Sequence, residues 1–466
     1  MANLFSSINV ALSALLAQQQ VMTIIEHNVA NANTEGYHRQ TAVTSASPAV
    51  SLSNSYYGTG VGQMGSGVLV TSIKRYSVDF YNTRFRSENQ EASKWNAEQE
   101  IVSQIEATFL ETSSDGLLPK IDAFFNEWQS LSNDPTDISV RRELLDSAKE
   151  LASAINIRFR QIEEIRAVQD LSIKQRVEEI NLLASQIADL NREISRIKSV
   201  GDAPNDLLDT RDRALDRLSE LTGATSFELD NGEVTVSIDG HILVYGHDTH
   251  ELGTEIDPLN ENLLKMVWAD GRDMDPPSGE LAGIIEARDS VFIDQRTGLN
   301  ELSMALKEKV NELHVDGFGL DGSTGLDFFV GDDAGHFEVN SDLEDIEKIG
   351  ASSVNGEVGN SDVARTIFEL RTTPTMNTDT TTFYQYYSDQ VSKLGLTVKR
   401  AKTNAYDRSL VADALKAQRD SVAGVDLNEE AANMVKSQKA YEAAARLIST
   451  IDEMLDTVIN RMGAGR

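Results

Sequence analysis

The 466-residue sequence contains no cysteine. This absence excludes disulfide bonds, thiolate catalysis, zinc fingers and iron–sulfur clusters. It fits a cytosolic protein, and it also suits a protein that is made in one redox compartment and used in another. Aromatic residues make up only 6% of the chain, which favours extended helical packing over a dense globular enzyme.

Positive charge is also in short supply. The chain has 42 basic against 74 acidic residues, a formal net charge of -32. A surface of that sign repels phosphate backbones and anionic lipid heads, so we expect no binding to nucleic acid or to anionic membranes. The acidic character mainly indicates solubility.

Long apolar runs are the third feature that the sequence lacks. No window approaches the run of about 18 apolar residues that a spanning helix needs, so we expect no membrane span. The first residues, MANLFSSINVALSALLAQQQ, have no basic n-region, which argues against a cleaved signal peptide. The length predicts two or three domains.

Both ends of the chain carry heptad stripes. Near the N-terminus, apolar residues recur at alternating steps of four and three, the spacing of a coiled-coil seam. These positions are Leu4, Ile8, Ala11, Leu15, Met22, Ile25 and Val29, with Gln18 as the polar exception. Near the C-terminus, a seven-residue repeat comprises Leu427, Met434, Tyr441, Ile448, Leu455 and Met462, joined by Ala444, Ile451 and Val458.

The terminal stripes also predict when these helices are ordered. Burying the apolar side chains of the first stripe contributes roughly 10 to 15 kcal/mol. Fixing the backbone of the same helix costs about 1 to 2 kcal/mol per residue. We therefore expect the terminal helices to order only when partners cover them. Their remaining faces are small and uncharged, which permits further helices to approach closely.

The residues between the two stripes are mostly helical in pattern. Helices are expected near 95–109, 140–200, 207–222, 281–317 and 383–422. A change to period two around Asp230-Asn231-Gly232 predicts a β-hairpin near 225–250.

The predicted fold is therefore mainly α with a minor β part. The terminal helices pair as a coiled coil, and a bundle of long helices forms the body. That body holds a small β-hairpin region and a small inserted module of β or loop structure. The expected domains are 1–60 with 428–466, 61–317 with 385–427, and an outer module at 318–384.

Several motifs suggest chemistry that their context does not support. Gly60 to Gly65 matches GxGxxG, but a strand-like VLVTSI follows it where a dinucleotide fold needs a helix. His241, His247 and His250 lie near Asp248 in a hairpin and loop, so we expect solvated histidines and no metal site. The segment 316–327 lacks the ligand pattern of an EF-hand and predicts turns. No GxSxG occurs, and no cofactor or catalytic residue is expected.

Several segments resemble bacterial flagellar axial proteins, the rod, hook and hook-associated family. The N-terminal segment ANLFSSINVALSALLAQQQVMTIIEHNVANANTEGYHRQ is similar to the signature of that family. Further segments resemble the members that join hook to filament, and they span most of the chain: YGTGVGQMGSGVLVTSIKRYSVDFYN, NDLLDTRDRALDRLSELTGA, SGELAGIIEARDSV, KVNELHVDGFGLDGSTGLDFF and MVKSQKAYEAAARLISTIDEMLDTVINRM.

The resemblance implies a structural, non-enzymatic subunit that forms the hook–filament junction of the flagellum. It implies export from the cytoplasm without a cleaved signal peptide, an extracellular location, and polymerisation as a ring or helical assembly. The implied neighbours are hook protein and the third hook-associated protein, with a cytoplasmic export chaperone on the C-terminal helix beforehand. The module at 318–384 is smaller than the large variable domain of many relatives, which puts a surface role for it in doubt.

The expected assembly interface combines the two stripes with the asparagine-rich end of the first helix. There, short amides can bond exposed backbone groups or neighbouring subunits, and Gly36 can supply a positive φ. The residues are Leu4, Ile8, Leu15, Met22, Ile25, Asn28, Asn31, Asn33, Gly36, Tyr37, Met434, Tyr441, Ile448, Ile451, Leu455 and Val458.

Alternative interpretations remain open. An ordinary helix stop would also explain the asparagines. Another axial subunit, such as hook or distal rod protein, shares both terminal stripes. A secreted hydrolase on a helical scaffold would need a nucleophile or metal site that the sequence does not display.

Overall fold

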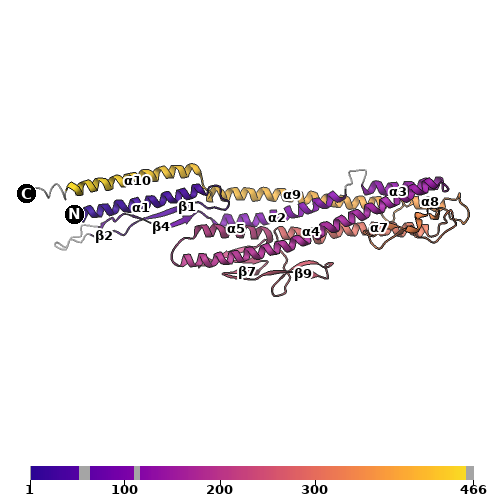
Figure 1. Cartoon of the computed structure of the whole chain (residues 1–466), viewed down its shortest axis with the longest axis horizontal. Coiled ribbons are helices and arrows are strands. Elements are labelled where there is room, and N and C mark those ends of the chain that lie inside the picture. Colours follow the sequence, from indigo (N-terminus) through magenta and orange to yellow (C-terminus); the bar gives the residue numbers. More distant parts are fainter. Residues whose placement is uncertain (1, 52–62, 110–115, 458–466) are drawn as a thin grey trace, which may run out of the picture. The chain divides into compact units, whose positions relative to one another are not determined.

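The computed structural model describes residues 2–51, 63–109 and 116–457. It is mainly helical, with small antiparallel sheets (Figure 1). The α-helices are α1 (Ala2–Ala30), α2 (Asp79–Phe109), α3 (Leu117–Asn133), α4 (Ile138–Ser199), α5 (Asn205–Thr222), α6 (Glu280–Glu286), α7 (Phe292–His314), α8 (Asp362–Glu369), α9 (Phe383–Ala423) and α10 (Leu427–Asp456). The predicted fold class is confirmed.

The strands are short and pair only with neighbours that run antiparallel. They are β1 (Gln40–Ala46), β2 (Val50–Ser51), β3 (Gln63–Met64), β4 (Val68–Arg75), β5 (Thr225–Glu228), β6 (Val234–Ile238), β7 (His241–Tyr245), β8 (Asp248–Thr249), β9 (Leu252–Asp257), β10 (Leu263–Trp268), β11 (Phe329–Val330) and β12 (Glu338–Val339). A π-helical turn, Ala287–Val291, joins α6 to α7.

The chain divides into two compact units. Unit 1 comprises Met1–Asn89, Ile180–Glu251 and Leu410–Arg466, and unit 2 comprises Gln90–Glu179 and Leu252–Ser409. Each unit is therefore assembled from segments that are far apart in sequence. The three-part division expected from the sequence remains a prediction.

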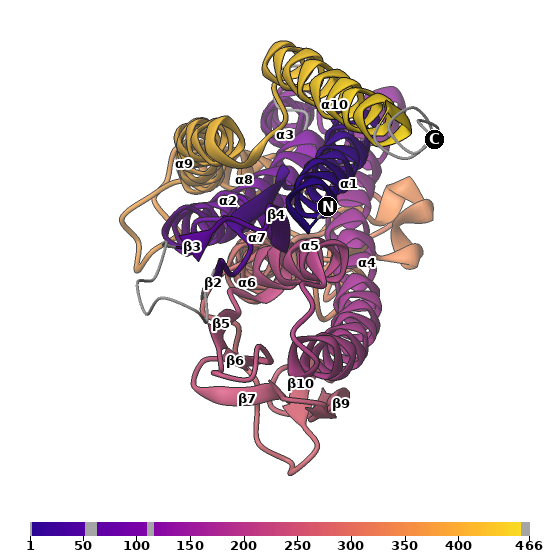
Figure 2. The ribbon, with the colours of Figure 1, turned by 90° about the vertical axis from the view of Figure 1, so that its left-hand side faces the viewer.

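In unit 1, α1 and α10 lie side by side, and α1 also packs against β1 and β4 (Figures 1 and 2). The most buried positions of α10 recur every seven residues, as a coiled-coil seam requires. They are Glu430, Ser437, Ala444 and Ile451. On α1 the buried residues are Ala11, Ala17, Ile24, Ile25 and Asn28. Pairing of the terminal helices was thus predicted correctly.

The hairpin predicted near 225–250 is a four-stranded sheet in the order β5-β6-β7-β8. Val234, Val236 and Ile238 alternate with more exposed residues and point into the unit, which is the period-two pattern of a half-buried strand. The sequence interpretation missed β1, the β9–β10 hairpin, α3 and α8. The strands and α8 are short, so their periodicity is weak. In α3 the signal was present, because Leu117, Ile121, Phe124, Phe125, Trp128 and Leu131 recur with helical spacing and are buried.

Unit 2 has an aromatic core between α3 and the segment that follows α7. Trp128 and Phe124 of α3 pack against Phe328 and Phe329, with ring centroids between 5.3 and 5.9 Å apart. All four side chains are 0% exposed. The segment that follows α7 is therefore packed onto α3 by its own aromatic residues.

From the sequence, no segment was expected to be apolar enough to span a membrane, and on length and composition alone that expectation is wrong. Among the described residues, Ser6–Ala30 is long and apolar enough to cross a bilayer. Serines and glutamines interrupt the stripe, so its apolar character was underestimated from spacing alone. Core helices meet the same criterion, and here α1 packs against α10 and the β1–β4 ribbon.

Candidate assembly site at the terminal helices

The end of α1 is fixed by a buried polar cluster in unit 1, centred on Asn28 and Glu430. Asn28 is 0% exposed and Glu430 is 1% exposed. The Asn28 amide donates to the Gln40 carbonyl at 2.9 Å and to Glu430 Oε2 at 3.2 Å, and its Oδ1 accepts from the Gln40 backbone N–H at 2.9 Å. One side chain therefore joins α1, β1 and α10.

Arg39 completes the link to α10. Its Nε donates to Glu430 Oε1 at 2.7 Å and its Nη2 to Glu429 Oε1 at 2.9 Å. Burial disfavours the charged guanidinium, but the two carboxylates outweigh it and raise the pKa of Arg39. The Arg39 N–H also donates to the Ala423 carbonyl at 2.8 Å. Arg39 is thus bonded to both helices that meet at the α9–α10 turn.

The turn after α1 depends on Gly36 and Tyr37. Gly36 has φ of 72°, the left-handed region that glycine adopts without strain, so this prediction is confirmed. A Cβ there would also lie 2.4 Å from Arg213 Cγ. The Tyr37 hydroxyl donates to Asn28 Oδ1 at 2.8 Å. Burial, together with Asp206, Asp209 and Glu430, raises the pKa of Tyr37, which keeps the hydroxyl protonated as a donor.

One face of α5 presents three aspartates, Asp209, Asp212 and Asp216, at steps of three and four. Arg75 Nη1 contacts Asp209 Oδ1 at 2.8 Å and Asp212 Oδ2 at 2.7 Å. Burial alone would raise the pKa of Asp212, but Arg75 and Arg86 lower it overall.

Asp216 extends this ladder of ion pairs. It lies 2.6 Å from Arg86 Nε and 2.7 Å from Arg419 Nη1 of α9. Arg419 in turn stacks over Phe85 at 4.2 Å. Alternating charges therefore tie α2, α5 and α9 together within unit 1.

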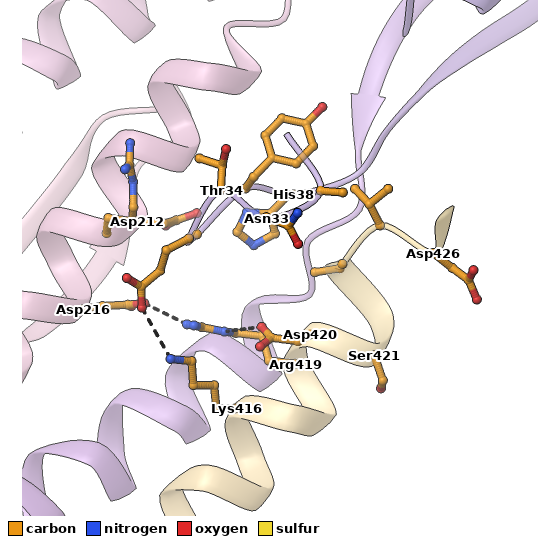
Figure 3. Close-up of a pocket in the computed structure, with 18 of the residues that line it drawn as sticks. Asn33, Thr34, His38, Asp212, Asp216, Lys416, Arg419, Asp420, Ser421 and Asp426 are labelled. Atoms are coloured by element: carbon orange, nitrogen blue, oxygen red, sulfur yellow. Dashed lines mark hydrogen bonds and ion pairs between the residues drawn. The ribbon is translucent and has the colours of Figure 1, made fainter. Parts of the chain in front are cut away.

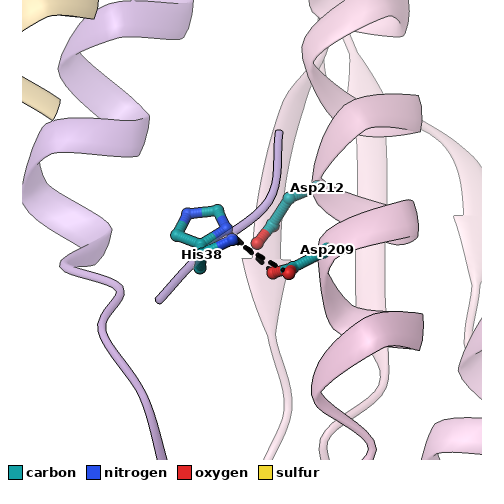
Figure 4. Close-up of side chains that lie close together, drawn as sticks. All are labelled: His38, Asp209 and Asp212. Atoms are coloured by element: carbon teal, nitrogen blue, oxygen red, sulfur yellow. Dashed lines mark hydrogen bonds and ion pairs between the residues drawn. The ribbon is translucent and has the colours of Figure 1, made fainter. Parts of the chain in front are cut away.

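His38 lies beside the same aspartates (Figure 4). Its backbone N–H donates to Asp209 Oδ2 at 3.0 Å, and its Nδ1 lies 2.8 Å from Asp209 Oδ1 without the geometry of a hydrogen bond. A histidine with two carboxylates is a donor set that zinc accepts. Arg75 already neutralises both carboxylates, so a cation would have to displace a guanidinium.

A cleft of about 830 Å³ opens beside this ladder, lined by the turn after α1, by α5 and by the α9–α10 turn (Figure 3). Its lining alternates in charge, with Lys416 and Arg419 near Asp212 and Asp216. A mixed lining of this kind suits protein contact better than a small ligand of one charge. A second groove, of about 280 Å³, runs along α1, β1 and α10.

The structure brings most of the expected interface residues together on α1 and α10. Ile25 and Ile451 are both 5% exposed, and Asn31 donates to the His27 carbonyl at 3.0 Å. Asn33 is exposed. The half-buried members are Ile8, Leu15, Met22, Met434, Tyr441, Ile448 and Leu455. Leu4 lies in α1 with no described side chain, and Val458 lies outside the described residues.

Sequence interpretation missed Glu430, Arg39 and the α5 aspartates. The signals were present, because Glu430 continues the seven-residue repeat of Ala444 and Ile451, and the aspartates share one helical face. A charged residue at an inward heptad position predicts a buried partner.

The remaining sequence motifs lie in strands, loops and turns. Gly60, Val61 and Gly62 lie outside the described residues, and the strand β4 follows Gly65 as expected. His247 and His250 are exposed and His241 is half-buried. Residues 316–327 form turns, as predicted, with φ of 82° at Gly322 and 79° at Gly325.

The two terminal helices pair, and the body is inserted between them in sequence, as expected of flagellar axial proteins. Family models agree at both ends: "Flagella basal body rod protein" matches residues 8–38, and "Flagellar basal body rod FlgEFG protein C-terminal" matches residues 417–462. Between them, "Flagellar hook-associated protein FlgK helical domain" matches residues 102–329. The chain belongs to the flagellar hook-associated protein 1 family, whose members are structural components of the bacterial flagellum.

Individual relatives cover nearly the whole chain. Flagellar hook-associated protein 1 of Bacillus subtilis is 28% identical over 100% of both chains. The Escherichia coli protein of that name is 24% identical over 98% of this chain and 99% of its own. A solved structure of the flagellar hook junction protein FlgK from Burkholderia pseudomallei superposes with a TM-score of 0.67 at 15% identity, over 73% of this chain and 100% of that chain. At that identity the likeness establishes the fold.

Proposed function

We propose that this chain is the structural subunit that joins hook to filament in the bacterial flagellum, and that it polymerises through α1 and α10. The interface residues are those expected from the sequence, from the α1 stripe through Asn28, Asn31, Asn33, Gly36 and Tyr37 to the α10 stripe. The subunit acts as a mechanical connector and catalyses no reaction.

The observation that carries the proposal is the incomplete burial of α1. In its most apolar window only 22% of the residues are buried within one chain. Leu12 and Leu16 are 45% and 51% exposed on α1, and Leu447 and Met454 are 48% and 54% exposed on α10. Large apolar side chains that stay exposed along paired helices mark a surface that other chains cover.

The polar cluster supports the same function. It holds the ends of α1 and α10 at a fixed register, while the apolar faces beyond it stay available to neighbours. The groove along α1, β1 and α10 gives a neighbouring helix a place to pack. Proposed neighbours are copies of this chain, hook protein on one side and the third hook-associated protein on the other.

The proposal also includes the route by which the subunit reaches the flagellum. The subunit reaches the extracellular flagellum from the cytoplasm without a cleaved signal peptide, and a cytoplasmic export chaperone covers the C-terminal helix before assembly. An exposed apolar face such as that of α10 would aggregate if it stayed uncovered.

The test places a charge on the apolar face of α1. Leu12→Asp with Leu16→Asp should abolish junction assembly and swimming, because the charged face cannot be buried between helices. Leu259→Asp is the matched control, since Leu259 is 97% exposed on the β9–β10 turn. Swimming assays and electron microscopy of hooks score both variants. Normal filaments in the α1 variant would contradict the proposal.

A second candidate, another axial subunit such as hook or distal rod protein, shares the terminal helices. Complementation separates the two, because only strains that lack the junction subunit should regain filaments when this chain is expressed.

A further inference from the structure

Part of α9 within unit 2 carries a basic and apolar surface. Residues 390–406 contain four basic side chains and no carboxylate, in a chain of net charge -32. Leu396 is 67% exposed and Tyr406 is 69% exposed. At 100° per residue, Leu396, Lys399 and Tyr406 fall within about 80° of one another around the helix. Lys393 and Lys402 flank them on either side.

The lysines of this surface are not used inside the chain. Lys393, Lys399 and Lys402 are exposed and form no ion pair with any residue that the structure describes. The fourth basic residue, Arg400, instead reaches Glu98 of α2, with Nη2 3.5 Å from Oε1. We call Lys393, Leu396, Lys399, Lys402 and Tyr406 the α9 surface.

A complementary surface lies elsewhere in unit 2. Residues 332–347, between α7 and α8, contain seven carboxylates and no lysine or arginine. Glu338 and Asp342 are exposed, and neither pairs with a basic side chain in the described ranges. We call residues 332–347 the acidic segment.

Packing and hydrogen bonds fix the backbone of the acidic segment. Phe337 is 0% exposed and stacks on Phe329, with ring centroids 4.6 Å apart. The Asn156 amide of α4 donates to the Ala334 and Phe337 carbonyls at 2.9 and 2.8 Å. The carboxylates are therefore presented in a defined arrangement, which specific recognition requires.

These two surfaces point to a second copy of this chain as the partner. Copies that each carry a charge of -32 repel one another. A contact between a basic surface of one copy and an acidic surface of the next lowers that repulsion and fixes the register of the contact. No ion pair joins the two surfaces within one chain among the residues described. Lys149 pairs with Glu344 and Lys348 with Asp345, so Glu338 and Asp342 are among the carboxylates that remain available to a second copy.

We propose that the α9 surface binds the acidic segment of a second copy of this chain. The two surfaces differ, so the contact is heterologous and repeats from copy to copy, as a ring or helical assembly needs. Lys399 and Lys402 would face the carboxylates, and Leu396 and Tyr406 would supply apolar contact. The inference rests on the proposed function and adds a contact between the chain bodies to the contact between terminal helices.

Cross-linking tests the contact directly, because the chain has no cysteine of its own. A full-length chain with both Lys399→Cys and Asp342→Cys is expressed in a strain that lacks the junction subunit. Isolated flagella are then treated with a short bismaleimide. The double variant should give a ladder of dimers and higher oligomers, whereas each single variant should stay monomeric.

The outcomes separate this contact from the proposed function. Assembled junctions that yield no ladder from the double variant would overturn the contact and leave the junction role intact. Dimers from either single variant would overturn the heterologous arrangement. Absence of the chain from flagella would contradict the proposed function, and the contact with it.

Charge reversal gives a second, independent measurement. A basic-to-acidic set changes Lys393, Lys399 and Lys402 to Glu, and an acidic-to-basic set changes Glu338, Asp342 and Glu347 to Lys. Each set alone should lower the number of filaments per cell about tenfold, and both sets on one chain should restore it to within about twofold. Equal defects in the single and combined sets, or no defect in either single set, would refute the contact.

Discussion

At the scale of single residues, the assembly site depends on a polar side chain in an apolar seam. Glu430 occupies an inward position of the α10 heptad and accepts hydrogen bonds from Asn28 and Arg39. A leucine there would bury more apolar area, but the Asn28 amide and the Arg39 guanidinium would each lose one hydrogen-bond acceptor. Polar residues at such positions commonly fix the register of paired helices.

Replacing Glu430 should therefore destabilise unit 1. Glu430→Ala removes the buried carboxylate that pairs with the Arg39 guanidinium and leaves it the exposed Glu429. We expect a loss of about 2 to 4 kcal/mol in the free energy of unfolding. Glu429→Ala is the control, because its side chain is 56% exposed and it should cost under about 1 kcal/mol. Urea denaturation of both variants measures the difference. Equal losses would show that the buried carboxylate has no special role.

His314 makes the stability of unit 2 depend on pH. Its Nδ1 lies 2.7 Å from the Leu326 carbonyl, and its Nε2 accepts from the Gly350 N–H at 2.9 Å. Burial lowers the pKa of His314 to about 4, although the Leu326 carbonyl favours the charged form. The folded unit therefore holds a neutral ring.

The unfolding free energy of unit 2 should fall at low pH, because the unfolded chain binds a proton on His314 more readily than the folded chain does. Below the ordinary histidine pKa of 6.5, the unfolded chain takes up a proton that the folded chain refuses. Unfolding free energy should thus fall as the pH drops from about 6.5 to about 4, by up to about 3 kcal/mol. His314→Gln should flatten this slope, whereas the exposed His250→Gln should leave it intact. An unchanged slope in His314→Gln would refute the assignment.

At the scale of elements, the sequence predicts best where a pattern repeats. The helices α1, α4, α9 and α10 lie within a few residues of their predicted ranges, because a 3.6-residue period persists over many turns. The helix α8 spans only Asp362–Glu369. A helix of that length shows too few repeats to stand out, and its stability comes from packing that only the folded chain reveals.

Packing between elements also decides where a small residue is required. On α6, a Cβ at Gly283 would lie 2.2 Å from the Lys94 carbonyl oxygen of α2 and 3.1 Å from Ala97 Cβ. The two helices therefore meet through bare backbone at this crossing. No local sequence pattern predicts a close contact between helices at this glycine.

Gly283→Ala should force α6 away from α2. We expect a loss of about 1 to 3 kcal/mol in unfolding free energy, the usual cost of an overpacked contact. Gly395→Ala on α9 is the matched control, because its Cβ would meet nothing within 4 Å and alanine stabilises a helix by roughly 0.5 to 1 kcal/mol over glycine. Thermal denaturation should therefore move the two variants in opposite directions. A shift in the same direction would contradict the close crossing.

At the scale of the whole molecule, the sequence showed which ends pair but not which side chains fix the pair. The heptad stripes predicted a seam that included Ile25 and Ile451, and both are buried. Val29 and Leu427 were predicted in the same stripes but are 44% and 52% exposed, so the register of the stripes was predicted only in part. The cluster around Arg39 and Asp209 joins residues more than a hundred positions apart. Single-sequence patterns report local periodicity, so partners brought together only by folding stay hidden.

The bond between Asn28 and Glu430 spans 402 positions along the chain. A ribosome that has made Asn28 must therefore add 402 further residues to reach Glu430. Unit 1 cannot close before Glu430 has been made, and contacts of such high sequence separation form slowly. The nascent chain therefore passes through a period in which α1 lacks its partner helix and the chain can still move through a narrow channel. Any factor that binds α10 prolongs that period.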